Sequence, residues 1–102
     1  MTTKNEDVVS DFVNSDKQSE NKNVFIKNNA IYSYGYHFPM GLKLNGCFII
    51  NESKYSQSTT RQQNELLRQV GGFKIYKTNT NKLKELIDRG VKSENELILN
   101  EL

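Results

Sequence analysis

Residues 31–70 read IYSYGYHFPMGLKLNGCFIINESKYSQSTTRQQNELLRQV, and this stretch decides the fold. An aromatic strand comes first, and Asn45-Gly46, a strong hairpin signal, then separates two apolar strands. A loop rich in serine and threonine leads from the last of these strands into an amphipathic helix. Consecutive strands followed by a helix are typical of an α+β domain.

Working outward, we expect a single α+β domain over residues 24–102. Its sheet should be small and mostly antiparallel, with three to five strands and two or three helices packed on one face. Residues 1–23 are polar and acidic and predict a flexible N-terminal arm. Within the arm, apolar residues at helical spacing indicate a short helix over residues 5–14, which could dock on the domain or on a partner.

The first hairpin is predicted to turn at Asn28-Asn29. Its second strand covers residues 30–38, and Pro39 ends it because proline cannot donate a ladder hydrogen bond. Strand alternation places four aromatic side chains on one face: Tyr32, Tyr34, Tyr36 and Phe38. This row has two interpretations, a stacking surface for single-stranded nucleic acid or a core covered by helices.

The central helix is predicted to begin at Thr60, an N-cap that forms a capping box with Gln63, and to run to about Val70. Three further elements are predicted: a strand over residues 73–78, a helix over residues 81–89, and a terminal helix that begins at a Ser93–Glu96 capping box.

Composition excludes several classes of protein. The formal net charge of +2 is too small to indicate nucleic-acid binding by itself. Cys47 is the only cysteine, so an intrachain disulfide and a zinc site built from cysteines are excluded, and its apolar neighbours predict a buried thiol. No stretch approaches the ~20 apolar residues of a membrane span. We expect no metal, no membrane contact and a cytoplasmic location (the host cytoplasm, if the protein is viral).

The residue types needed for catalysis are sparse. His37 is the only histidine and is interpreted as a surface or hydrogen-bonded structural residue. The carboxylates form no close pair in an apolar context, and the chain has no phosphate-binding loop, dinucleotide-binding turn or zinc spacing. We therefore expect a protein that is not an enzyme and uses no cofactor.

A candidate anion or nucleic-acid site lies at the start of the central helix, where polar and basic side chains gather: Lys54, Ser56, Ser58, Thr59, Thr60 and Arg61. The free N–H groups and the dipole of a helix N-terminus favour an anion such as phosphate. The alternative is that the hydroxyls only cap the helix. A second set of cations could form a basic patch or protect the strand edges: Lys27, Lys43, Lys74 and Lys77.

Four short motifs follow one another in the central segment: Ser33-Tyr34, Pro39 to Gly41, Phe48 to Asn51, and Tyr55-Ser56 with Thr59-Thr60. In this order they resemble a small domain of unknown function found in phage and other mobile-element proteins. Such domains often carry a histidine in the first helical turn, where this chain has Gln63. The resemblance implies a viral or plasmid-type origin and leaves the activity open.

The C-terminal third, residues 73–102, reads as a strand, a helix that ends at glycine, a serine-led cap and a second helix. It resembles a ribbon-helix-helix unit. The resemblance implies a dimer whose paired strands read the major groove, with Lys74, Tyr76 and Thr78 as the reading residues.

These patterns together predict a small non-catalytic binding protein of phage or mobile-element type. We expect it to be a monomer or homodimer that acts on nucleic acid or on a host protein. The alternative is a dimeric DNA-binding transcriptional regulator that uses the C-terminal third. A structural or assembly component is the third class that the sequence leaves open.

Overall fold

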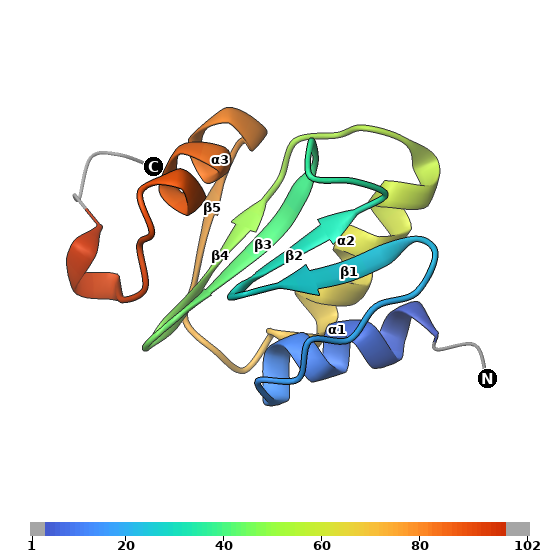
Figure 1. The fold of residues 1–102 in the computed structure, drawn as a ribbon, viewed down its shortest axis with the longest axis horizontal. Coiled ribbons are helices and arrows are strands. Elements are labelled where there is room, and N and C mark those ends of the chain that lie inside the picture. The colour runs from blue at the N-terminus through green and yellow to red at the C-terminus, as the bar shows by residue number, and fades with distance from the viewer. Residues whose placement is uncertain (1–3, 98–102) are drawn as a thin grey trace.

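The computed structural model describes residues 4–97, which form a five-stranded sheet with helices on both faces (Figure 1). The predicted α+β class, with a mostly antiparallel sheet, is confirmed. The elements follow in chain order: α1 (Asn5–Asn14), β1 (Val24–Lys27), β2 (Ala30–Ser33), β3 (Pro39–Leu44), β4 (Cys47–Asn51), α2 (Gln57–Gln69), β5 (Ile75–Thr78), α3 (Thr80–Asp88) and the 3₁₀ turn η1 (Glu94–Glu96).

The strands lie in the sheet in chain order, from β1 to β5. The first three pairings are antiparallel, and β4 pairs with β5 in parallel. A parallel pair needs a crossover connection, which α2 supplies here. Both predicted hairpin turns are confirmed, since Asn28 has a φ of 56° and Gly46 a φ of 103°, the left-handed values that tight turns require.

One face of the sheet is covered by α1 and α2, and we call it the closed face. Its core contains four residues of α1: Val8, Val9, Phe12 and Val13. Leu66 and Val70 reach the same core from the α2 segment, and Ile31 and Met40 reach it from the strands. The sequence left open whether the helix of the N-terminal arm docks on the domain. It does, because its four apolar side chains lie on one side and are buried.

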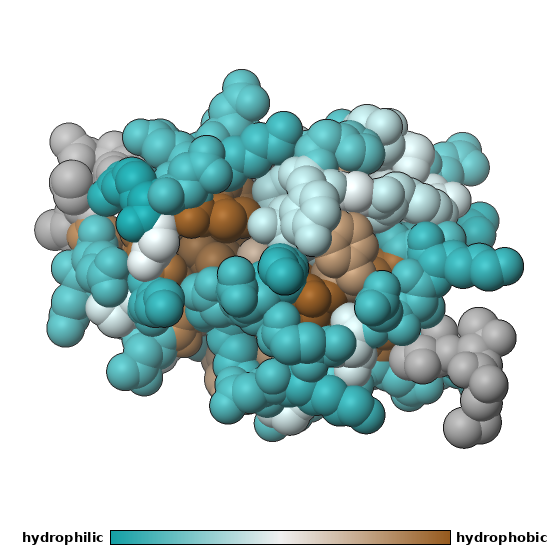
Figure 2. All heavy atoms as spheres, viewed as in Figure 1, coloured by the Kyte–Doolittle hydropathy of each residue, from teal (hydrophilic) through white to brown (hydrophobic). Residues whose placement is uncertain are grey.

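The opposite face is covered only in part. Leu83 and Leu86 of α3 pack with Leu42 and Ile49, and α3 lies chiefly on β3 and β4. All five residues of β4 are buried, as expected for a strand that is covered on both sides. We call the β1–β2 part of this side the open face. Figure 2 shows apolar and weakly polar side chains at the surface over the middle of the molecule, bordered by hydrophilic ones.

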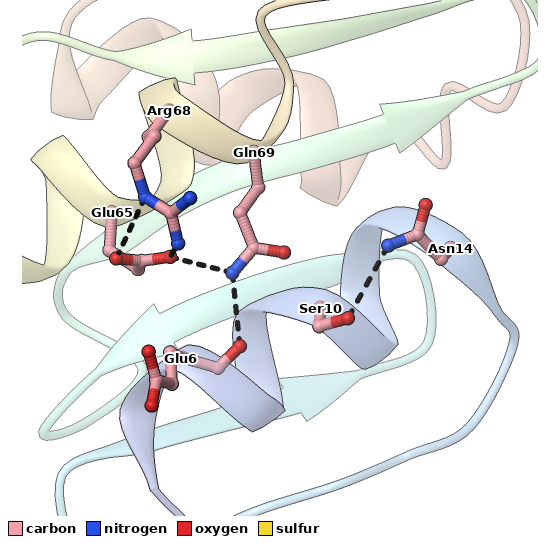
Figure 3. Close-up of polar contacts among 6 residues, drawn as sticks. All are labelled: Glu6, Ser10, Asn14, Glu65, Arg68 and Gln69. Carbon is pink, nitrogen blue, oxygen red and sulfur yellow. Dashed lines mark hydrogen bonds and ion pairs between the residues drawn. The ribbon is translucent and has the colours of Figure 1, made fainter.

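Polar contacts join α1 to α2 at the rim of the closed face (Figure 3). Gln69 Nε2 donates to the backbone oxygen of Glu6 at 3.0 Å and to Glu65 Oε2 at 2.7 Å. Arg68 forms an ion pair with Glu65 one helical turn away. The hydrogen bond from Arg68 is the main cause that lowers the pKa of the Glu65 carboxyl, and the bond from Gln69 adds to it.

The aromatic strand is shorter than predicted. β2 ends at Ser33, and Tyr34 adopts a φ of 65°, which takes the chain out of the strand. The prediction that Pro39 ends a strand is wrong, because Pro39 is the first residue of β3. The first position of a strand tolerates the missing N–H, so proline is compatible with both places. As a result Tyr32 and Phe38 belong to cores on opposite sides of the sheet, and the predicted four-residue aromatic row does not exist.

The central helix begins earlier than predicted. Ser56, not Thr60, is the N-cap, and its Oγ accepts a hydrogen bond from the backbone N–H of Thr59 at 3.1 Å. Gln63 does not complete a capping box, because its Nε2 donates to the backbone oxygens of Asn51 and Ser53.

The predicted helix over residues 81–89 is confirmed as α3, capped by Asn79 and followed by Gly90 with a φ of 72°. Among the described residues the predicted terminal helix is represented by η1, in which Ser93 Oγ donates to Glu96 Oε1 at 3.3 Å. The remainder of that predicted helix, residues 98–102, lies outside the described residues.

Candidate functional site

The hydroxyl groups of the predicted anion site are largely engaged within the protein. Ser56 caps α2, and Thr60 Oγ1 donates to the backbone oxygen of Ser56 at 2.9 Å. Thr59 is buried, and its Oγ1 lies 3.1 Å from Ser33 Oγ in β2. Ser58 is exposed on the outside of the first turn. These bonds fix the start of α2 against the end of β2 and leave the two cations of the site, Lys54 and Arg61, at the surface.

A buried polar network lies beneath this helix start. Ser33 Oγ also donates to Gln62 Oε1, and Asn51 Nδ2 donates to the backbone oxygen of Pro39 at 2.7 Å and to Thr80 Oγ1 at 2.9 Å. Gln63 Nε2 joins the network by donating to the backbone oxygens of Asn51 and Ser53, whereas its Oε1 is buried without a partner among the described residues. Such networks specify one arrangement of the chain, because each buried polar group needs its partner. The loops above the network are therefore held on a fixed base.

An open hollow of about 610 Å³ lies at the surface of this region. Lys54, Tyr55 and Ser56 line it from the loop before α2, and Thr60 and Arg61 line it from the helix. The lining contains two cations and no carboxylate, although Glu52 is exposed earlier in the same loop. The hollow therefore suits a negatively charged group next to an aromatic ring.

Three exposed tyrosines gather around the same end of the sheet, and we call them the tyrosine surface: Tyr34 (47% exposed), Tyr36 (61%) and Tyr55 (57%). The first two lie in the β2–β3 loop, and Tyr55 lies in the β4–α2 loop. The loops touch through His37, whose Nε2 lies 3.3 Å from Tyr55 Oη. The left-handed φ of Tyr34 is unusual for a bulky residue, and strain of this kind is often found at functional sites.

The tyrosine surface continues onto the open face. Tyr36 contacts the rings of Phe25 and Tyr32, with all three centroid separations in this group between 5.0 and 5.1 Å. Phe25 and Tyr32 are register partners in β1 and β2. Burial is the main cause that raises the pKa of the Tyr32 hydroxyl, with smaller effects from Tyr36 and Asp88. Tyr32 thus supports the two more accessible rings from below.

The residues of the alternative DNA-reading strand lie on and beside β5. Lys74 forms an ion pair with Glu94, and Tyr76 Oη donates to the same carboxylate at 2.6 Å. The hydrogen bond to Glu94 is the main cause that raises the pKa of Lys74. Thr78 is buried, and β5 pairs with β4 of its own chain. DNA reading by this strand stays a prediction.

The four lysines considered for a basic patch do not all gather in one place, because Lys27 and Lys43 border the same hollow whereas Lys74 and Lys77 lie beside and in β5. Lys27 alternates with the buried Ile26 and therefore points to the open-face side. Lys43 Nζ donates to the backbone oxygen of Ser15, just after α1. Lys74 is paired with Glu94, as described above.

Metal and membrane sites find no support in residues 4–97. This part of the chain contains no group of three or more histidine, cysteine, aspartate or glutamate side chains that could hold a metal ion. It also contains no helix with the length and apolar character of a membrane span. Cys47 is buried, and burial raises the pKa of its thiol, so it is a poor nucleophile at neutral pH.

Comparisons with models of protein families, with curated proteins and with solved structures gave no match.

Sequence reasoning missed the ring cluster of Phe25, Tyr32 and Tyr36. The signal was available in part, because a two-residue turn at Asn28-Asn29 places Phe25 opposite Tyr32. The position of Tyr36 was not available, since it depends on the loop that begins at Tyr34.

Proposed function

We propose that the protein is a small non-catalytic module that binds single-stranded nucleic acid through the tyrosine surface. The observation that carries this proposal is the exposure of Tyr34, Tyr36 and Tyr55 on two loops that touch through His37, with Lys54 and Arg61 lining the hollow next to Tyr55. Aromatic rings stack on unpaired bases, at about 1–3 kcal/mol per base, and cations next to them follow the phosphate backbone.

The exposed rings favour a single strand over a duplex, because bases in a duplex are already stacked on one another. Duplex reading by β5 has less support, since Lys74 and Tyr76 both contact Glu94 and Thr78 is buried. A host protein as partner and a phage or mobile-element origin stay predictions, the second resting on the resemblance of the central segment.

Binding of a short fluorescent single strand, in DNA and RNA form, measured by anisotropy tests the proposal. Tyr36→Ala should weaken binding roughly 5- to 150-fold, which corresponds to about 1–3 kcal/mol for one stacked base. Phe73→Ala is the matched control, because Phe73 is also an exposed aromatic residue (51%). It contacts Phe48 near the start of β4, whereas Tyr55 follows the end of that strand. The Phe73→Ala variant should bind like the unchanged protein.

Absence of binding to every strand at low salt would overturn the proposal and make a protein partner the next question. An equal loss in Tyr36→Ala and Phe73→Ala would also contradict it, because the tyrosine surface would then have no special part. A preference for duplex over single strand would move the β5 hypothesis to first place.

The two cations of the hollow allow a second test through the salt dependence of binding. Each phosphate contact to a single strand contributes about 0.7 to the slope of log K against log salt concentration. Lys54→Gln and Arg61→Gln should each make the slope shallower by about that amount. Lys77→Gln, on the closed-face side of β5, should leave the slope unchanged.

A further inference from the structure

A cavity of about 510 Å³ lies at the other end of the open face, between the β1–β2 turn and the segment that follows α3. The turn contributes Lys27, Asn28 and Asn29, and the segment after α3 contributes Gly90 and Lys92. Tyr32 forms part of the wall. We call this hollow the lysine cavity. Because Tyr32 also contacts the ring of Tyr36, the lysine cavity begins one aromatic ring away from the tyrosine surface.

The walls of the lysine cavity are held in place by hydrogen bonds. Asn29 Nδ2 donates to the backbone oxygen of Lys43 at 3.0 Å and to that of Val91 at 3.4 Å, so it ties the hairpin tip to the segment after α3. On the outer side, the backbone N–H of Asn28 donates to Gln18 Oε1 at 2.7 Å, and Gln18 Nε2 donates back to Asn28 O at 2.9 Å. The cavity is therefore formed before any ligand arrives.

Two of the cations at the lysine cavity are free to meet a ligand. The side chains of Lys27 and Lys92 are exposed and make no hydrogen bond or ion pair with the residues of the described chain. Lys43 also borders the cavity, but its Nζ is engaged with the backbone of Ser15. No carboxylate lines the cavity. Two unpaired ammonium groups beside an aromatic wall are suited to a phosphate that is attached to a base.

Two features near the lysine cavity disfavour an anion: the partial negative charge at the C-terminus of α3 and the carboxylate of Asp88. Hydrogen bonds reduce the first of them. The backbone N–H groups of Arg89, Gly90 and Val91 donate to the last turn of α3, so the carbonyls of Glu85, Leu86 and Ile87 are already satisfied. Asp88 follows Ile87, which lines the cavity, and its charge adds to the raised pKa of Tyr32 in the wall. Removal of this charge should strengthen binding of an anion.

We propose that the lysine cavity binds a phosphate group of nucleic acid, so that a strand crosses the open face from the tyrosine surface to the β1–β2 turn. The path of the strand rests on the proposed function, whereas phosphate binding by the cavity does not. The phosphate can come from within the strand or from its end. Binding of a mononucleotide tests the cavity without assuming the strand path or the position of the phosphate.

The test is a titration of the ¹⁵N-labelled protein with adenosine monophosphate and, separately, with adenosine, followed by the amide signals of Asn28 and Asn29. The monophosphate should shift both signals and adenosine should not. The double variant Lys27→Gln/Lys92→Gln should lose the shifts, Asp88→Asn should give them at lower ligand concentration, and Lys77→Gln should behave like the unchanged protein. Equal shifts with both ligands, or shifts retained in the double variant, would overturn the proposal.

Strands with a phosphate or a hydroxyl at each end then identify the source. If the terminal phosphate is bound, its removal should weaken binding as much as the double variant does; if an internal phosphate is bound, its removal should have no effect. The two proposals fail separately. Loss of strand binding in the double variant but not in Tyr36→Ala would contradict the tyrosine surface, and the reverse would contradict the lysine cavity.

Discussion

The two faces of the same sheet are built differently. On the closed face, α1 and α2 bury an apolar core that reaches from Val24 in β1 to Phe48 in β4. On the other side α3 lies chiefly over β3 and β4, and the rings of Phe25 and Tyr36 remain accessible beyond it. Apolar side chains that stay exposed beside unpaired cations contribute little to stability and are typical of recognition surfaces. We therefore expect the closed face to contribute more to stability than the open face, where the proposed binding takes place.

The largest expected difference between the two faces is in the free energy of unfolding. Leu66→Ala on the closed face removes a fully buried side chain of α2 and should lower the free energy of unfolding by about 2–5 kcal/mol. Tyr36→Ala should lower it by about 1 kcal/mol or less, because the residue is mostly exposed and loses only its ring contacts with Phe25 and Tyr32. Urea unfolding followed by circular dichroism measures both. Equal losses in the two variants would contradict the division between the faces.

Glycine 41 tests how closely α2 lies on the closed face. A Cβ at Gly41 would meet Leu66 Cδ2 at 3.0 Å, so Gly41→Ala should cost about 1–3 kcal/mol of stability through overpacking. Gly72 is the matched control, because no atom lies within 4 Å of a Cβ placed there. Gly72→Ala should leave the urea midpoint nearly unchanged. A stable Gly41→Ala protein would mean that α2 can move away from the sheet.

A substitution at Tyr34 should affect strand binding without affecting stability. Glycine adopts the left-handed φ of this position without strain, and the relief of about 1 kcal/mol roughly offsets the greater freedom of glycine in the unfolded chain. Tyr34→Gly should therefore change the melting temperature little and still weaken strand binding. A protein that binds normally after this change would show that the strained tyrosine serves the loop and not the ligand.

The smallest expected effect is the change in stability at acidic pH. The carboxyl pKa of Glu65 is lowered in the folded protein, chiefly by the hydrogen bond from Arg68. The stability this contributes is complete above the pKa of the unfolded chain and is lost as the pH falls through the lower, folded value. Glu65→Gln should therefore reduce the difference in melting temperature between neutral and acidic pH. An unchanged pH profile would contradict the prediction that the Glu65 carboxylate contributes to stability.

Much of the fold was accessible from the sequence because local signals agreed with one another. Asn28-Asn29 and Asn45-Gly46 fixed two hairpins, and the apolar spacing around Leu83 and Leu86 fixed α3. The break at Tyr34 was not accessible, since a tyrosine rarely adopts a left-handed φ and only the surrounding structure imposes it. That break also changed the site, because it turns a predicted strand row into an exposed loop.

The sequence placed the two cations of the candidate site and offered helix capping as the alternative use of its hydroxyls; binding at the site stays a prediction. Lys54 and Arg61 lie at the surface as expected, whereas Ser56 and Thr59 are used by the helix start and the network beneath it. Local sequence showed where hydroxyls gather but not that Ser33, 26 positions from Thr59, would bond to one of them. The pairing of distant residues depends on the sheet register and cannot be derived from spacing along the helix.

The most direct test of the account maps strand binding onto the two faces by nuclear magnetic resonance. A short single strand should shift amide and aromatic signals of Phe25, Tyr34, Tyr36 and Tyr55 and leave the outer surface of α1 unchanged. Shifts on α1, or on β5 alone, would contradict the assignment of binding to the tyrosine surface and the open face.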